Sequence, residues 1–573
     1  MNAKNTKSPN TGDAAPELAQ PSQKPWWLAP ILLTTVVILG YGIAPTRLPL
    51  MGEETCRALH GIEMARSGDW LVATNQGVPR LDRPPLQYWT LAVIHKWIHP
   101  LDPLTVRLFM VIVTLVTALI IQWYSKSFLS DTAAFLAAVA YPTMGHVFDL
   151  GRRAETDGLF AMLLAAALMV WHHGYSQRWR PIWTWTFGAA VAALATLAKG
   201  SQGPVAFFGT VYLFLLIRRD WRYLLCWSHV LGIVVFLSMI GVWQVPFYLV
   251  TGWDGTQKIW LAPYVGRMDT DIHKLLLHLV EFPVNMFGAT LPWSALLLGL
   301  CNRRFWRLEG KLKSAVLFVL LGMVVIFFPV WISEGGHHRY IMPMYPLMAV
   351  LCGVVVQQAL AADLTSFLRQ FWYGYVRVMA MILAGFVTAF LMATLVAEFS
   401  DAHWVHALAQ SWSLMTVWII CTVIGVTSIF RYVSLGRTGQ EVVVTFAIAS
   451  MLAICFNGAI VNATARRTEN IGPDVIALHR SLSPQTQLVS FGQINEKFVY
   501  WYGEPIPILD IPKTSGDLPD DLGYFAINVQ RGQTVEMSFE WEQIATFSTE
   551  RKRNHPNPKL IVLVGRWTRE KEN

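Results

Sequence analysis

The feature that most constrains the fold is a series of about thirteen apolar runs, most of them long enough to cross the hydrocarbon core of a bilayer. They lie near 27–44, 104–124, 131–148, 158–174, 182–198, 203–217, 223–247, 275–300, 314–332, 341–360, 376–397, 413–430 and 441–461. Of the 573 residues, 54% are hydrophobic and only 14% are charged. This balance is typical of an integral membrane protein. We therefore predict an α-helical multi-pass membrane protein with about thirteen transmembrane helices.

The two ends of the chain differ from this apolar region. Residues 1–24 are polar and predict a disordered tail, which leaves 25–463 as the membrane domain with a long first loop at 45–103. From 464 to 573 the polarity is mixed, with strand-like runs at 487–491, 498–502 and 560–564 and a helical pattern at 473–482. The sequence therefore predicts a small C-terminal α/β domain.

Charge gives the expected orientation. Lysines and arginines cluster in the short connections that face the cytoplasm if the N-terminal tail is cytoplasmic, as the positive-inside rule requires. An odd number of spans then places the C-terminal domain in the periplasm. The net charge of +8 is spread over these clusters and forms no basic face for a nucleic acid. The six cysteines, five of them in or beside apolar runs, form neither a disulfide framework nor a zinc-binding spacing.

The first loop, 45–103, carries ionisable residues close to the membrane, where they are costly and call for a function. Residues 54–67 have helical periodicity, with Leu59, Ile62 and Ala65 on one side and Arg57 and His60 on the other. This pattern predicts a helix that lies on the bilayer. A second amphipathic segment, 86–98, follows the Pro84-Pro85 pair.

Four acidic residues in two loops face the same compartment: Glu53, Glu54, Glu155 and Asp157. A group-transfer enzyme needs a carboxylate to orient or deprotonate the attacking oxygen, which is a role that these residues could fill. The alternative is that they pair with nearby arginines and only hold the loops together. We favour function for Glu53 or Glu54, because capping a surface helix needs only one of them.

Basic residues stand at or near the ends of the spans, at the depth of a lipid phosphate: Arg57, Arg83, Lys199, Arg267 and Arg339. The planar guanidinium group of arginine suits phosphate oxygens. The alternative is that these side chains extend to lipid headgroups. Their number, in loops that also contain acids, favours a bound phosphate. The adjacent His337 and His338 point in different directions, so a structural role is favoured over metal binding.

The order of these motifs resembles that of the polyprenyl-phosphate-dependent C-type glycosyltransferases, especially the bacterial undecaprenyl-phosphate aminoarabinose transferases that modify lipid A. The motifs are an acidic first loop ending in Arg83-Pro84-Pro85 and Trp89, a Glu155-x-Asp157 loop, Lys199-Gly200, and Arg339-Tyr340 followed by Pro343 and Pro346. The resemblance covers nearly the whole chain and implies about thirteen spans with a C-terminal periplasmic domain.

The resemblance implies roles for individual residues. Glu53 stands where the family has its catalytic aspartate, with Glu54 and Asp157 as further catalytic carboxylates. The residues that it implies for the carrier phosphate are Arg57, Arg83, Lys199, Arg267, Arg339 and Tyr340, and those for the remaining substrate contacts are Glu155, His273, Lys274 and Tyr345. Cys56 and either Pro263 or Tyr264 replace an arginine and a histidine that are usual in the family.

From the sequence we predict an inner-membrane enzyme that transfers a sugar from an undecaprenyl-phosphate carrier to a periplasmic acceptor. A lipid A phosphate is the favoured acceptor, followed by hydroxyls of the lipopolysaccharide core or another glycan and then by protein hydroxyls. No cofactor is certain, and a divalent metal stays possible. The rival hypotheses are a transporter of a lipid-linked sugar and a non-catalytic scaffold, although neither paired halves nor broken midplane helices are evident.

Overall fold

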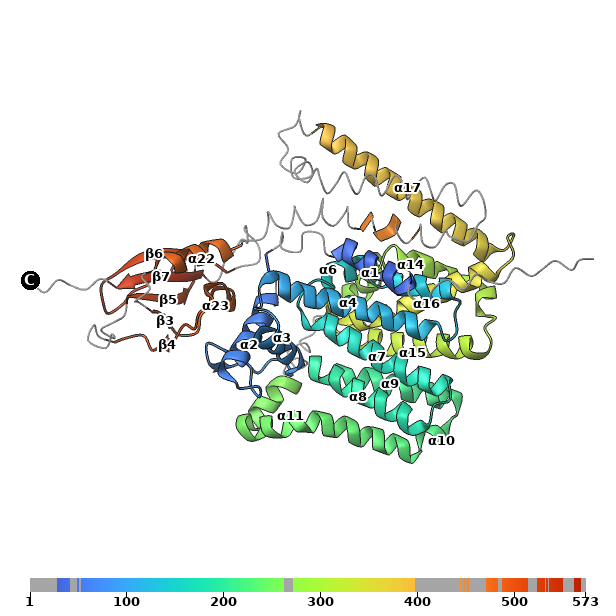
Figure 1. The fold of residues 1–573 in the computed structure, drawn as a ribbon, viewed down its shortest axis with the longest axis horizontal. Helices are drawn as coiled ribbons and strands as arrows, with labels where there is room; N and C mark the ends of the chain where they lie inside the picture. Colours follow the sequence, from blue (N-terminus) through green and yellow to red (C-terminus); the bar gives the residue numbers. More distant parts are fainter. Residues whose placement is uncertain are drawn as a thin grey trace, which may run out of the picture.

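The computed structural model describes residues 28–41, 49–50, 53–261, 272–396, 444, 447–449, 451–452, 470–482, 487–513, 523–530, 532–533, 535–549 and 561–567. Its largest part is a bundle of long helices, and a small sheet domain lies at one end of the molecule beside α2 (Glu54–Ser67) and α3 (Leu86–Trp97) (Figure 1). The predicted tail at 1–24 and the predicted span at 413–430 lie outside the described residues.

The helical bundle contains most of the predicted apolar runs. Its α-helices are α1 (Leu28–Tyr41), α4 (Pro103–Ser125), α5 (Asp131–Ala140), α6 (Gly145–Leu150), α7 (Thr156–Ser176), α8 (Pro181–Lys199), α9 (Gln202–Arg218), α10 (Trp221–Leu224), α11 (Trp227–Trp260), α13 (Ile272–Ala289), α14 (Trp293–Leu296), α15 (Gly310–Trp331), α16 (Tyr345–Ala361) and α17 (Phe367–Val396). Three 3₁₀ helices accompany them: η1 (Leu297–Cys301), η2 (Arg303–Trp306) and η3 (His338–Met344).

The helix ends follow from local sequence. Asp102 accepts a hydrogen bond from the backbone N–H of Thr105 at 2.7 Å, and Pro103 follows it, so α4 begins with a capping residue and a proline in its first turn. Glycines let helices approach closely: a Cβ at Gly188 of α8 would lie 2.9 Å from the Trp171 side chain of α7. Gly252, with φ of 67°, bends α11.

The membrane-spanning character of the bundle is confirmed, but the count of thirteen spans is not. Among the described residues, six helices are long and apolar enough to cross a membrane, or seven if α13 and the helices after it form one span with a 102° bend. The predicted run at 131–148 is interrupted, since α5 and α6 are separated by a turn, and α1 and α9 are short. The length of an apolar run in the sequence therefore overestimates the length of the regular helix that forms there.

The first loop folds into two helices and a hairpin: α2 (Glu54–Ser67), β1 (Thr74–Asn75), β2 (Val78–Pro79) and α3 (Leu86–Trp97). Both predicted helices are confirmed, but α2 is not a helix exposed on a bilayer. It packs against α3 and against the C-terminal domain, and its polar residues Arg57 and His60 are buried. Protein covers the polar side of α2, because the carboxylate of Asp82 and the hydroxyl of Tyr88, both in the first loop, bind Arg57.

The C-terminal domain is the predicted α/β unit. It contains α22 (Gly472–Ser481), β3 (Leu488–Phe491), α23 (Glu496–Tyr502), β4 (Ile508–Leu509), β5 (Tyr524–Val529), β6 (Trp541–Ser548) and β7 (Ile561–Trp567). The strand order is β4-β3-β5-β7-β6, with β3 parallel to both of its neighbours and the other pairs antiparallel.

One strand prediction in this domain is wrong. The segment 498–502 lies in helix α23, because the side chain of Asn495 caps the helix start and Gly503, with φ of 84°, ends it. Phe498 and Tyr502 are four residues apart and both buried, which is helical spacing. The aromatic and β-branched composition that suggested a strand reflects the packing of this short helix.

Candidate active site

Most of the predicted acidic and basic residues meet in one cavity of about 390 Å³. It is formed by the first loop, the start of α7, the end of α8, α11 and η3. Its lining residues are Glu53, Arg57, Arg80, Leu81, Asp82, Arg83, Glu155, Thr156, Asp157, Lys199, Lys258, Arg339 and Tyr340. Eight of the residues that the sequence singled out are therefore brought together from segments that are far apart in the chain.

Arg57 organises the first-loop side of the cavity. Its buried guanidinium donates to Glu53 at 2.9 Å, to Asp82 at 3.3 Å and to the hydroxyl of Tyr88. Tyr88 in turn donates to the other oxygen of Asp82 at 3.2 Å. Burial raises the pKa of Asp82, but the positive charge of Arg57 and its neighbours outweighs burial and lowers it to about 2. Asp82 is therefore an anion that holds Arg57 in place.

Glu53 occupies the more open end of this network. It precedes the first turn of α2, and its side chain is 45% exposed, whereas that of Arg57 is 3% exposed. The spacing of four residues along the helix brings the two side chains together. The carboxylate of Glu53 is thus oriented by Arg57 while it remains accessible to a molecule in the cavity.

Two further arginines follow the hairpin. Arg80 lies 3.9 Å from Asp82 and 3.5 Å from Glu496 of the C-terminal domain. Arg83 donates to the backbone carbonyl of Asp82 at 3.2 Å and forms no ion pair with a carboxylate among the described residues. Its Nε atom is buried without a hydrogen-bond partner in the same part of the chain. Arg83 is therefore the lining cation with the most unused capacity for an anion.

The opposite side of the cavity holds two ion pairs from the membrane helices. Lys199, at the end of α8, contacts Asp157 in the first turn of α7, and Arg339 donates to Glu155 at 2.9 Å. Lys199 also lies over the ring of Tyr340, with its Nζ 4.7 Å from the ring centroid. Burial raises the pKa of Glu155, in opposition to the charge of Arg339. The four charged side chains thus fix one another.

The lining has more cations than acids. It contains six lysine or arginine side chains and four carboxylates, which leaves a formal excess of two positive charges. Two of these cations, Arg80 and Lys258, also pair with carboxylates outside the lining, Glu496 at 3.5 Å and Asp254 at 2.7 Å, which offset this excess. The cavity is suited to bind phosphate because its cations are fixed in place.

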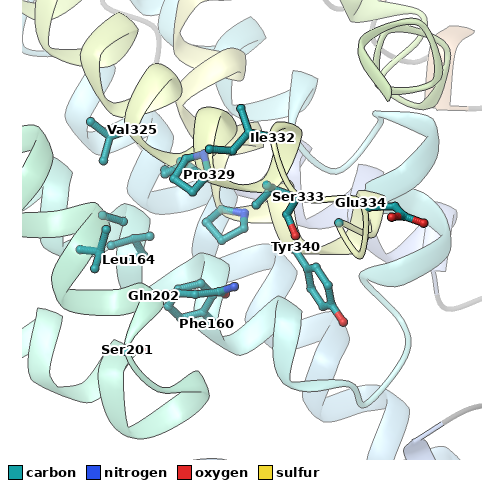
Figure 2. A pocket seen from close by; sticks show the side chains of 16 residues that line it. Phe160, Leu164, Ser201, Gln202, Val325, Pro329, Ile332, Ser333, Glu334 and Tyr340 are labelled. Atoms are coloured by element: carbon teal, nitrogen blue, oxygen red, sulfur yellow. The ribbon is translucent and has the colours of Figure 1, made fainter. Parts of the chain in front are cut away.

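An apolar cavity of about 550 Å³ adjoins the polar one, and Tyr340 lines both. Its walls come from α7, α9 and α15, with Phe160, Leu164, Val325 and Pro329 facing the same space (Figure 2). Tyr340 lies at one side of this group in the same view. The two cavities together offer neighbouring sites for a charged group and for a hydrocarbon chain.

Some predicted site residues lie elsewhere. Glu54 is fully buried and accepts hydrogen bonds from Arg107 and from the backbone N–H of Ala154, so it faces the protein interior instead of the cavity. Tyr345 is buried beside His146, to which it is hydrogen-bonded at 2.8 Å. His273 and Lys274 are exposed on the first turn of α13 and do not line the cavity. Arg267 lies outside the described residues.

The sequence-based site set omits four polar lining residues: Arg80, Asp82, Thr156 and Lys258. Arg80 and Asp82 lie within three residues before Arg83, so a cluster of three charges ahead of two prolines was the available signal. Lys258 is on α11, which continues beyond the apolar run that predicted it. Among the described residues, no group of three or more His, Cys, Asp and Glu side chains is placed to hold a metal ion. The sequence left the need for a divalent metal open, and it stays untested.

Comparison with known proteins finds chains that are similar to this one in sequence and in fold. Residues 82–244 match the model of the family described as dolichyl-phosphate-mannose-protein mannosyltransferase. An undecaprenyl phosphate-alpha-4-amino-4-deoxy-L-arabinose arabinosyl transferase of Edwardsiella ictaluri is 27% identical over 57% of this chain and 59% of its own length. A second enzyme of that name from Sodalis glossinidius is 27% identical over 52% of this chain and 54% of its own. The matched regions thus span somewhat over half of these relatives.

The fold extends the likeness to nearly the whole chain. The crystal structure of ArnT from Cupriavidus metallidurans bound to undecaprenyl phosphate matches with a TM-score of 0.65 at 16% identity, covering 93% of this chain and 97% of that one. At this identity the match concerns the fold alone. Together with the sequence matches, it confirms the resemblance that the order of motifs predicted.

Proposed function

We propose that this chain, which resembles the polyprenyl-phosphate-dependent C-type glycosyltransferases in sequence and fold, transfers a sugar from an undecaprenyl-phosphate carrier to an acceptor at the periplasmic face of the inner membrane. The observation that carries the proposal is the pair of adjoining cavities, one cationic and one apolar, with Tyr340 between them. A lipid-linked phosphate needs both environments side by side. Arg83, which has no carboxylate partner among the described residues, is the first candidate to bind its phosphate.

The proposed reaction is an inverting displacement at the anomeric carbon of the sugar. An acceptor oxygen forms a bond to this carbon while the bond between the carbon and the carrier phosphate oxygen breaks. The electron pair of the broken bond stays on the phosphate. Arg83, Lys199 and Arg339 stabilise the negative charge that grows on the departing group, which is the task that fixed cations perform best. These three side chains bind the departing phosphate most tightly in the transition state.

Glu53 is the proposed catalytic carboxylate, because it is accessible and oriented by Arg57. With a hydroxyl acceptor, Glu53 would take the proton that the attacking oxygen loses. With an acceptor that is already an ionised phosphate, Glu53 would only position it. Asp157, held by Lys199, would assist from the opposite side of the cavity.

We propose a lipid A phosphate as the acceptor. The six lysine and arginine side chains of the lining offer N–H donors for an anionic acceptor beside the carrier phosphate. Two of the similar proteins are named as arabinosyl transferases that use an undecaprenyl-phosphate-linked amino sugar. A pentose of this kind is therefore the first donor sugar to test.

Mass spectrometry of lipid A tests the acceptor. We expect a strain that lacks this protein to lose a sugar-sized mass from lipid A, wild type to restore it, and Glu53→Ala to fail to restore it at equal expression. An unchanged lipid A mass in the deletion strain would contradict a lipid A acceptor. A mass change in the lipopolysaccharide core or in a protein would then identify the acceptor instead.

A further inference from the structure

The hairpin of the first loop is attached to the C-terminal domain by the side chain of Gln76. Its amide nitrogen donates to the hydroxyl of Ser490 at 2.9 Å and to the carbonyl of Ile506 at 3.1 Å, and its amide oxygen accepts from the backbone N–H of Ile494 at 2.9 Å. Gln76 reaches these groups from the tip of the β1–β2 turn, where its φ is +53°. One side chain thus makes three specific contacts across the two domains.

Additional contacts hold the same surface. Gln493 donates to the carbonyl of Asn75 at 3.2 Å, and Arg66 of α2 donates to the carbonyl of Gly503 at 2.7 Å. At the end of the loop, the hydroxyl of Tyr500 donates to the carbonyl of Leu101 at 2.8 Å. The C-terminal domain therefore binds the first loop at several points, and side chains and backbone groups of both take part.

The charged part of this interface continues into the proposed active site. Arg80 bridges Glu496, in the first turn of α23, and Asp82, which lines the cavity. Asp82 holds Arg57, and Arg57 holds Glu53. A continuous chain of charge contacts thus runs from a residue of the C-terminal domain to the proposed catalytic carboxylate.

The backbone gives a second, shorter connection. The N–H of Arg80 donates to the carbonyl of Ala73 at 2.7 Å, so the segment after the hairpin is tied to the strand before it. Arg83 follows three residues later, immediately before the Pro84-Pro85 pair that leads into α3. A hairpin held at its tip therefore restricts where Arg83 can lie.

We propose that the C-terminal domain is a positioning element for the carrier phosphate, in which Gln76 and Glu496 act through the β1–β2 hairpin and Arg80 to set the place of Arg83. The inference rests on the proposed function, because it assumes that Arg83 binds this phosphate. Neither Gln76 nor Glu496 touches the substrate, so both are positioning residues. A displacement of about 1 Å at a site of group transfer can lower the rate by about 100-fold.

Binding of undecaprenyl phosphate to the purified full-length protein tests this proposal without turnover. The variants are Gln76→Met and Glu496→Asp, which keep the net charge while they remove the amide contacts and shorten the reach to Arg80. Matched controls are Gln543→Met and Glu542→Asp, which alter exposed residues of the edge strand β6. The Kd for undecaprenyl phosphate is measured for each variant and control in two backgrounds, one with Arg83 and one with Arg83→Ala.

With Arg83 present, we expect Gln76→Met and Glu496→Asp together to raise the Kd by about 10-fold at unchanged stoichiometry, and the controls to leave it unchanged. In the Arg83→Ala background the same pair should change the Kd by less than about 2-fold, because the residue through which they act is absent. Loss of binding sites at an unchanged Kd, an equal effect in both backgrounds, or no effect would each overturn the proposal.

The two proposals fail differently. A wild-type protein that binds undecaprenyl phosphate but transfers no sugar contradicts the proposed function, while the binding measurements still decide the role of the C-terminal domain. Normal transfer and an unaltered Kd in the Gln76→Met and Glu496→Asp protein would overturn positioning and leave the proposed function intact.

Discussion

Asp82→Asn should destabilise the protein by about 2.5 kcal/mol at neutral pH. The carboxylate of Asp82 is bound to Arg57 and Tyr88, and its pKa in the folded protein is about 2, compared with its ordinary value of 3.8. Each pKa unit corresponds to about 1.4 kcal/mol. Breaking a fully buried ion pair costs about 3–5 kcal/mol. The smaller loss expected for Asp82→Asn is consistent with an Asp82 side chain that is 31% exposed and with an Arg57 that still pairs with Glu53.

The sign of the pH dependence follows from the lowered pKa. The stabilisation is fully present above the pKa of the unfolded chain, near 4, and is lost as the pH falls through about 2. We expect the thermal midpoint of Asp82→Asn, measured in detergent micelles, to lie a few degrees below that of wild type at pH 7. This gap should close between about pH 4 and pH 2.

A matched control is Asp131→Asn, because Asp131 pairs with Lys126 at 3.2 Å but its side chain is 86% exposed. Such exposed pairs contribute little, so this midpoint should remain close to that of wild type at every pH. A midpoint gap for Asp82→Asn that is absent at pH 7, or that persists unchanged at pH 2, would refute the assignment of Asp82 as the ion-pair partner of the buried Arg57.

Two other substitutions separate folding from catalysis. Glu54→Gln leaves the buried Arg107 without its carboxylate and should lower the free energy of unfolding by about 3 kcal/mol. Sugar transfer per folded molecule should stay unchanged. A folded but inactive variant would return Glu54 to the set of catalytic residues. Val205→Trp narrows the apolar cavity and should raise the KM for the carrier by about 10-fold with little change in kcat. The same change at Val242, which is exposed and outside the cavity, is its control, and equal effects of both would contradict a carrier site there.

Much of the architecture follows from local sequence. The periodicity of 54–67 predicted α2, and the mixed polarity after 464 predicted the C-terminal α/β domain. The loops around Glu53, Arg83, Asp157 and Lys199 indicated one site, and the structure brings these residues into one cavity. Charge close to a membrane is costly, so its presence is informative without any knowledge of the tertiary structure.

The errors concern what tertiary contacts decide. Nothing local distinguishes Glu53 from Glu54. Neighbouring side chains on a helix point about 100° apart, so Glu53 faces the cavity while Glu54 faces Arg107. The polar side of α2 suggested exposure, whereas Arg57 is buried because Asp82 and Tyr88, which lie 25 and 31 residues later, are available as partners. The contacts of Gln76 with Ser490 and Ile494 join segments more than 400 residues apart, and no periodicity predicts them.

The most direct test of the central claim is the release of free undecaprenyl phosphate from a sugar-loaded carrier by the purified protein. We expect wild type to release it only when an acceptor is present, and to form one sugar–acceptor product for each carrier consumed. Glu53→Ala and Arg83→Ala should fold and show no release. Movement of the intact carrier across a vesicle membrane without release, or full activity in both variants, would contradict a transferase that uses this cavity.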